Sequence, residues 1–219
     1  LPTETDEDLG GIVDLVHRVV GAGRSAGVSS FQATVSISTF VPKPHTPFQW
    51  EPMLPFDEIR RRQRFLRDRL RSRAVEVSVH DAAGSVLESL LGRGDERAAA
   101  AVADAYAAGA YLDAWSEHFS WDRWRDALER AGVSPDEASR PLDPLAPTPW
   151  DHVSCGLDPD FLRREREHAL AARPGATCDP SPEHFRCQVC GLGCEAPPAA
   201  GAVPVRFDGT IDPTGRGAT

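Results

Sequence analysis

The chain has 219 residues, of which 41% are hydrophobic and 26% charged, and a formal net charge of −9 at pH 7. This length suits one large domain or two small ones, and the composition is that of a globular protein. The acidic balance argues against a generally nucleic-acid-binding surface, and no apolar run reaches transmembrane length. We therefore expect a cytoplasmic protein with no membrane partner.

The first predicted element is an amphipathic helix. Residues 6–21 repeat apolar side chains at helical spacing. Thr5 and Asp8 form a capping-box pattern before this segment, with Asp in place of the usual Glu. We expect Gly21 and Gly23 to stop the helix.

Two predicted strands flank a second long helix. Residues 32–41 and residues 75–81 alternate apolar and polar side chains, which is typical of strands. Residues 54–73 predict the helix between them, so the order suits a parallel α/β array. Eight arginines lie between Arg60 and Arg73. We interpret them as a solvated helix face; the alternative, an RNA or phosphate contact, lacks the neighbouring aromatic residues on which bases stack.

The loop after the first strand is the strongest candidate ligand site. Three prolines between residues 42 and 47 end the strand, and α/β sheets place ligands at the carboxyl ends of their strands. Lys43, the single lysine of the chain, lies in this loop with His45 and Gln49. Because ammonium and guanidinium groups are not interchangeable, a lone lysine in an arginine-rich chain favours a specific role. The alternative is a merely rigid turn.

The middle of the chain predicts helices. Residues 84–91, 96–109 and 121–131 have helical patterns. Four aromatic side chains lie at helical spacing, which favours a packed core over a site. They are Trp115, Phe119, Trp121 and Trp124.

The last part of the chain combines a proline-rich linker with clustered cysteines. The linker covers residues 141–149, and a further helix is expected from Asp158 to about Ala172. Beyond Cys194 the chain is rich in Pro, Gly and Ala, so we expect a mobile tail.

The clustered cysteines predict a metal centre. Their spacing is C-x8-C-x2-C-x3-C, and thiolates two residues apart can hold one metal ion from a tight turn, which Gly191 and Gly193 allow. The four residues are Cys178, Cys187, Cys190 and Cys194. His184 and the more distant Cys155 are possible substitute ligands. Zinc and an iron–sulfur cluster both suit four thiolates, and spacing alone does not separate them.

Several segments resemble the radical SAM superfamily. Residues 1–9 (LPTETDEDL) resemble a segment from the late part of radical SAM barrels. Residues 36–50, with the loop FVPKPHTPFQW, resemble a strand and loop of the cobalamin-binding type of these proteins. Residues 113–119, residues 149–152 and the terminal cysteines resemble the C-terminal region of the same subfamily.

The resemblance implies an α/β fold that is the C-terminal part of a partial (β/α) barrel. Such enzymes bind S-adenosylmethionine on a [4Fe-4S] cluster, and its reductive cleavage gives a 5′-deoxyadenosyl radical that abstracts hydrogen from the substrate. The family's C-x3-C-x2-C motif is absent here. The resemblance therefore places the cluster ligands, and any cobalamin domain, upstream of this chain, and no catalytic residue can be assigned. Lys43, His45 and Gln49 would line the cofactor and substrate cavity.

This interpretation divides the chain into four parts. We expect the last part of the barrel at 1–82, a helical region at 83–140, a linker, helix and metal-binding segment at 141–195, and a disordered tail at 196–219. The chain begins at Leu1 and its single methionine is Met53, so we expect a piece of a longer protein. The expected partner is the missing N-terminal half of the same protein. Without that half, this chain is expected to be inactive.

Two other functions remain open at this stage. One is a zinc-stabilised module that binds RNA or a protein through the arginine-rich helix. The other is a structural role, in which the segment only completes and covers the barrel. The substrate, a small molecule or an RNA, is not assigned by the sequence.

Overall fold

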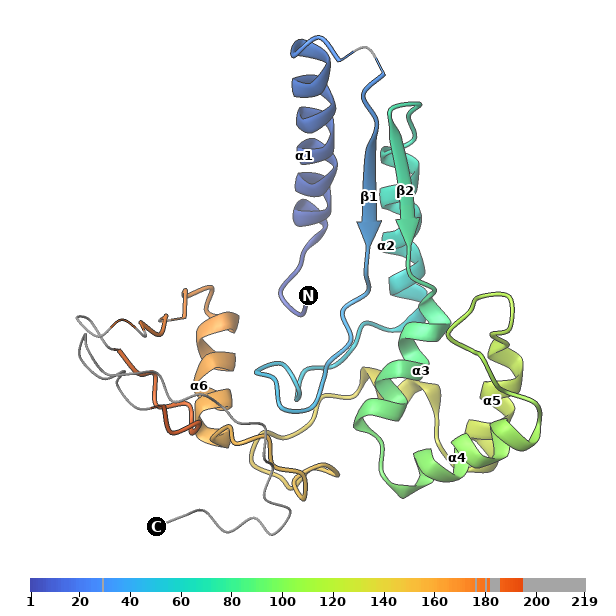
Figure 1. The fold of residues 1–219 in the computed structure, drawn as a ribbon. Coiled ribbons are helices and arrows are strands. Elements are labelled where there is room, and N and C mark those ends of the chain that lie inside the picture. Colours follow the sequence, from blue (N-terminus) through green and yellow to red (C-terminus); the bar gives the residue numbers. More distant parts are fainter. Residues whose placement is uncertain (29, 176, 180, 182–185, 195–219) are drawn as a thin grey trace, which may run out of the picture.

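The computed structural model describes residues 1–28, 30–175, 177–179, 181 and 186–194 (Figure 1). The tail predicted at 196–219 lies outside these residues. The elements are α1 (Asp6–Ser25), β1 (Ala33–Ile37), α2 (Phe56–Arg69), β2 (Val75–Val79), α3 (Ala82–Arg93), α4 (Glu96–Ala107), α5 (Trp121–Arg130), the 3₁₀ helix η1 (Pro135–Ser139) and α6 (Pro159–Leu170). The fold is thus a mixture of helix and strand, as the sequence predicts.

Helix α1 begins where expected and ends later. The predicted capping box is present, with Thr5 and Asp8 each accepting a hydrogen bond from the other's backbone N–H. The helix runs through Gly21 and Gly23 to Ser25, so the prediction that these glycines stop it is wrong. A glycine inside a helix costs only about 1 kcal/mol relative to alanine, which neighbouring contacts can offset.

Glycines near the end of α1 have two different roles. At Gly23, an added Cβ would lie 2.5 Å from the ring of Phe31, so the glycine lets that ring pack on the helix. Gly27 provides the actual stop, with φ of 81°. Its N–H bonds to the Arg24 carbonyl and the Val28 N–H bonds to the Gly23 carbonyl, which is the Schellman arrangement.

The two strands form a parallel pair whose two faces differ. Val35 lies opposite Val77, and Ser36 opposite Ser78. The apolar side chains pack with α1 and α2 on a core that includes Leu9, Val13, Val16, Leu66 and Leu70. In Figure 1, α1 and α2 flank the strands, and β1 and β2 point the same way, toward α3. Within the described residues no further strand joins this sheet.

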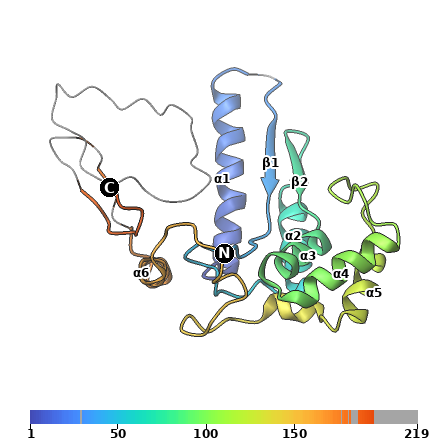
Figure 2. The same ribbon diagram turned by 60° about the horizontal axis from the view of Figure 1, so that its bottom comes forward.

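A second core lies below the strands. It joins α3, α4, α5 and η1 around fully buried residues such as Ala101, Ala105, Ala127 and Leu128. Figure 2 shows these helices gathered at one side, next to the carboxyl ends of the strands. Met53 of the hub loop and Ile59 of α2 also belong to this core, so it extends beyond residues 83–140.

One core prediction in this region is wrong. Trp124 is buried, and Phe119 and Trp121 pack against the core. Trp115 is 60% exposed, because residues 112–119 form turns before α5 begins and not a continuous helix. Leu112 has a φ of 60°, which breaks the helical spacing on which the prediction relied.

Helix α6 lies apart from the other helices and follows a loop-rich segment (Figures 1 and 2). It begins at Pro159, capped by Asp158 as expected, and ends at Leu170. None of the described helices is long and apolar enough to cross a membrane.

Candidate functional site

Residues 40–55, here called the hub loop, connect β1 to η1, α3 and α6. The Met53 N–H bonds to the Ala138 carbonyl of η1, and the Trp50 carbonyl accepts from the Leu142 N–H. The Glu51 carboxylate pairs with Arg166 of α6 at 2.6 Å. Trp50 and Met53 are buried. The loop that the sequence singles out is therefore a structural centre as well as the continuation of β1.

Gln49 is held inside the protein. Its side chain is only 5% exposed. Its Oε1 accepts hydrogen bonds from the His45 N–H at 2.7 Å and from the Trp150 Nε1–H at 2.9 Å. These bonds join the hub loop to the Pro-Trp-Asp-His segment, so two segments that carry the sequence resemblance lie together. In this arrangement Gln49 fixes the loop, and its oxygen faces protein donors.

Lys43 lies on the surface of the hub loop. Its ammonium pairs with Glu88 of α3, and both side chains are about half exposed. This pair joins the loop to the helical region. An exposed ion pair of this kind contributes at most about 1 kcal/mol to stability.

His45 lines a groove between the hub loop and the linker. The groove measures about 480 Å³, and Gln49, Trp150, Asp151, Cys155 and Arg163 also line it. Hydrogen bonds from Thr148 lower the pKa of Asp151, with smaller contributions from nearby His45 and His152. A φ of 59° at His45 marks the tight turn that places the ring there.

The exposed face of the sheet carries a set of polar residues that the sequence analysis did not select. Thr34, Ser36, Glu76, Ser78 and His80 alternate with the packed valines and are all exposed. Thr34 lies opposite Glu76, and Ser36 opposite Ser78, so hydroxyl and carboxylate groups stand side by side. The alternation that predicted the strands contained this signal, since half of its positions are polar.

A larger hollow lies beside the carboxyl end of β1. It measures about 600 Å³ and extends between α1, β1, α2 and the hub loop. Its lining combines apolar side chains such as Ile12 and Met53 with polar ones such as Ser38, Arg62 and Gln63. Gln63 donates to the His80 carbonyl at 2.9 Å and so ties α2 to the end of β2.

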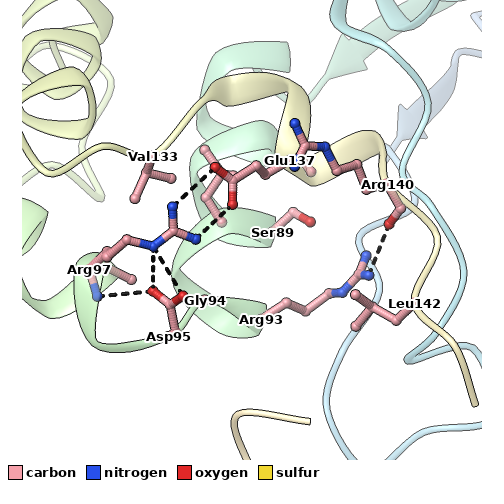
Figure 3. Close-up of a pocket in the computed structure, with 12 residues that line it drawn as sticks. Ser89, Arg93, Gly94, Asp95, Arg97, Val133, Glu137, Arg140 and Leu142 are labelled. Atoms are coloured by element: carbon pink, nitrogen blue, oxygen red, sulfur yellow. Dashed lines mark hydrogen bonds and ion pairs between the residues drawn. The ribbon is translucent and has the colours of Figure 1, made fainter. Parts of the chain in front are cut away.

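A smaller pocket of about 210 Å³ lies between α3, α4 and η1 (Figure 3). Arg97 bridges the carboxylates of Asp95 and Glu137, both at 3.0 Å. Arg93 donates to the carbonyls of Glu51 and Arg140. Within the described part of the chain, the buried hydroxyl of Ser89 has no hydrogen-bond partner. Arg97 is thus paired with two carboxylates and Arg93 is bound to backbone carbonyls, which favours a structural role for these side chains.

The arginine-rich helix is α2, and several of its guanidinium groups are used internally. Arg61 and Arg62 both bond to Glu58, and this lowers the pKa of the Glu58 carboxyl from 4.5 to about 2. Arg62 also pairs with Glu4, and Arg60 lies over the ring of Phe56. These contacts support the interpretation of a solvated, self-paired face over an RNA-binding one.

The predicted metal ligands lie in the last described segment. Cys178, Cys187 and Cys194 are exposed, Cys190 is partly buried, and none of them forms a disulfide. His184 lies outside the described residues. Among the residues that the structure describes, no three Cys, His, Asp or Glu side chains converge on one point as a metal site.

Comparison with known proteins gives a partial similarity. The chain is 28% identical over 97 residues to an uncharacterized protein of Methanocaldococcus jannaschii, a match that covers 44% of this chain and 20% of that protein. The chain thus spans about a fifth of the length of the relative it matches. No protein-family model matches the chain, and no solved structure matches it.

Proposed function

We propose that this chain is the C-terminal part of a radical SAM enzyme, in which the β1–β2 pair closes a partial (β/α) barrel. The polar face of the pair would line the cavity that holds S-adenosylmethionine and substrate. Helices α1 and α2 would form part of the outer layer, and the hub loop would lie at the mouth of the cavity.

The observation that carries this proposal is the contrast between the two faces of a parallel sheet. Parallel sheets normally have both faces covered and read as continuous apolar runs. Here one face packs on α1 and α2, while Thr34, Ser36, Glu76 and Ser78 stay exposed on the other. In a (β/α) barrel, helices cover the outer face and the inner face is enclosed by other strands. A polar inner face suits a barrel that encloses a polar ligand.

The side chains on this face fit S-adenosylmethionine but not its cluster. Hydroxyl groups donate and accept hydrogen bonds, and a carboxylate accepts from ribose hydroxyls or an ammonium group. Glu76, Ser36 and Ser78 offer these groups. By contrast, every cysteine of the chain lies at residue 155 or later, so residues 1–82 hold no thiolate for an iron–sulfur cluster. The cluster ligands would come from elsewhere in the longer protein.

Within this proposal, the residues of this chain bind and orient. Glu76 would accept hydrogen bonds from the ligand, and Ser36 and Ser78 would do so as a cross-strand pair. Gln49 would act at a distance, because its hydrogen bonds to His45 and Trp150 hold the hub loop in place. The cluster and S-adenosylmethionine would supply the hydrogen-abstracting radical chemistry when bound.

The test is reductive cleavage of S-adenosylmethionine by the longer protein with its cluster reconstituted anaerobically, measured as 5′-deoxyadenosine formed. Glu76→Gln is expected to lower the rate about tenfold, as expected for loss of one charge-assisted hydrogen bond. The double variant Ser36→Ala with Ser78→Ala is expected to weaken S-adenosylmethionine binding. Glu129→Gln removes an exposed carboxylate from α5, away from the sheet, and is the matched control.

Two results would count against different parts of the proposal. Unchanged cleavage in all sheet variants would remove the polar face from the ligand site. No cleavage by the unaltered, cluster-loaded protein would overturn the assignment to radical SAM chemistry itself.

A further inference from the structure

The pocket between α3, α4 and η1 contains two buried hydrogen-bond donors, the hydroxyl of Ser89 and the Nε–H of Arg93 (Figure 3). Neither donor has a hydrogen-bond partner among the residues that the structure describes. The two residues are four positions apart on α3, so their side chains lie on the same face of the helix, and both line the pocket. Because a buried donor without an acceptor is destabilising, an acceptor bound beside them would satisfy both groups at once.

Another serine of the same helix shows how such a hydroxyl is ordinarily satisfied. Ser85 is 5% exposed, and its Oγ donates to the carbonyl of Asp81, four residues earlier, at 2.9 Å. This bond is common for a serine inside a helix. Ser89 is even more deeply buried, at 1% exposed, yet its hydroxyl makes no such bond within the described part of the chain. The Ser89 hydroxyl can therefore donate to a group that enters the pocket.

The Arg93 guanidinium adds a positive charge to this face of the helix. Its two terminal nitrogens donate to the backbone carbonyls of Glu51 and Arg140, at 2.9 and 3.2 Å. These carbonyls hold the guanidinium in place but do not neutralise it, and the described residues include no carboxylate in direct ion contact with Arg93. Burial lowers the pKa of Arg93, and the charge of Glu51 only partly opposes this effect. A partly desolvated cation with one unused N–H is suited to binding an anion.

The other charged residues of the pocket determine how much charge a ligand would neutralise. Arg97 is already paired with Asp95 and Glu137, and the exposed Arg140 also lines the pocket. The lining thus contains three arginines and two carboxylates, and one positive charge is in excess. A ligand with a single negative charge would balance it.

The size and the apolar part of the pocket describe the rest of the ligand. The volume of about 210 Å³ is well above the ~15 Å³ that one water molecule needs. The apolar side chains of the lining suit a short hydrocarbon group. They belong to Leu90, Ala98, Val133, Ala138 and Leu142.

We propose that this pocket binds a small aliphatic carboxylate, with one carboxylate oxygen accepting from the Arg93 Nε–H and the other from the Ser89 hydroxyl. The two oxygens match the two unused donors, and the single negative charge matches the excess charge of the lining. A phosphate fits less well, because it carries more charge and the terminal nitrogens of Arg93 that would grip it already bind carbonyls. The inference is independent of the proposed function.

The experiment is titration of the complete 219-residue chain with isobutyrate, followed by nuclear magnetic resonance of its backbone amides. Saturable shifts are expected for amides around Ser89 and Gly94. Isobutyramide has the same shape without the charge and is expected to bind about tenfold more weakly or worse. No saturable shift with isobutyrate would overturn the site. Equal affinity for the amide, or tighter binding of inorganic phosphate, would overturn the assignment of a carboxylate.

Two serine variants test the contact with the ligand. Ser89→Ala is expected to weaken isobutyrate binding about tenfold, since it removes one hydrogen bond to a charged group. Ser85→Ala is the matched control, because it removes a buried hydroxyl of the same helix that already bonds to Asp81, and it should leave binding unchanged. Unchanged binding in Ser89→Ala, or equal weakening in both variants, would contradict a direct contact with Ser89.

Unfolding in the absence of ligand checks whether the Ser89 hydroxyl is satisfied inside the protein. Removal of an unpartnered buried hydroxyl is expected to leave the thermal midpoint unchanged or to raise it. Ser85→Ala is expected to lower the midpoint, because it loses a hydrogen bond. A lower midpoint for Ser89→Ala as well would show that its hydroxyl already has a partner, such as an ordered water, and would overturn the proposal.

Discussion

The helical region around α3, α4, α5 and η1 and the sheet unit around α1, β1, α2 and β2 satisfy their packing in different ways. The helical region has an enclosed core, with Ala101, Ala105, Ala127 and Leu128 fully buried, and Met53 of the hub loop and Ile59 of α2 complete it. The sheet unit packs one face on its helices and leaves the polar face bare. The helical region, completed by Met53 and Ile59, is the closed unit of the two, and the sheet unit is open on its polar face.

This difference has an energetic basis. An isolated pair of strands is only marginally stable in water, and parallel pairs need cover on both faces. The hub loop compensates in part, because it ties the strands to η1, α3 and α6. We therefore expect the helical region to unfold as one unit and the sheet unit to open more readily.

The largest effect expected in this comparison is the loss of stability caused by Leu128→Ala in the helical core. Leu128 is fully buried, so the change is expected to cost about 2–5 kcal/mol of unfolding free energy. Urea denaturation followed by circular dichroism measures it. Leu145→Ala, at a residue 82% exposed, is the control and should cost less than about 0.5 kcal/mol. A loss below about 1 kcal/mol for Leu128→Ala would mean that the region is not a closed core.

Gln49→Ala tests the connection between the two units and the linker. The change removes both bonds to its Oε1 and leaves the Trp150 N–H buried without a partner, at a cost of about 1–3 kcal/mol. Hydrogen exchange is expected to rise in residues 144–155 and to stay unchanged in α5. Gln49→Glu keeps an acceptor oxygen for Trp150 but places a carboxylate at a buried position, so it is expected to protect residues 144–155 from exchange while lowering global stability. Unchanged exchange in Gln49→Ala would show that the linker is held by other contacts.

The two capping boxes allow the same kind of substitution, removal of the capping hydroxyl, to be made in each unit. Thr5→Ala in the sheet unit and Ser134→Ala in the helical region each remove a cap, at about 1 kcal/mol. Ser134→Ala is expected to lower the midpoint of global unfolding. Thr5→Ala is expected mainly to speed hydrogen exchange in the first turn of α1. Equal effects on the global midpoint would remove the distinction between a closed and an open unit.

The smallest expected effect is on the dependence of stability on pH below about 4.5. The hydrogen bonds from Arg61 and Arg62 lower the pKa of Glu58 to about 2, so the carboxylate contributes stability above its ordinary value of 4.5. That contribution is lost as the pH falls from about 4.5 to about 2. Glu58→Gln should flatten the acid dependence of stability in this window by about 0.5 kcal/mol, because the group is partly solvated. Parallel curves for the two proteins would contradict the assignment.

The main elements of the fold could be predicted from sequence because local patterns dominate them. The capping box at Thr5 and the two alternating strands are local signals, and all of them are present in the structure. The end of α1 was missed because the glycine that stops the helix is Gly27, with its positive φ and Schellman hydrogen bonds, and not Gly21 or Gly23. Trp115 was placed in the core because spacing alone does not show that the chain turns at Leu112.

The candidate site was only partly predictable. The sequence singled out the hub loop as a candidate ligand site, and in the structure Gln49 is a buried tether and Lys43 an exposed ion-pair partner. Trp150 lies far from Gln49 in the sequence, and Glu88 lies far from Lys43. No local sequence pattern could therefore predict these two contacts. The polar face of the sheet was not predicted as a site, because the strands were predicted from the apolar half of the alternation.

The position of Lys43 has a practical consequence. It is the single lysine of the chain and its side chain is 52% exposed. Apart from the α-amino group, an acylating dye would therefore find one amine to modify, on the loop that joins the strands to the helices. A fluorophore attached there would report, from one defined position and without any engineered residue, when that loop changes its surroundings.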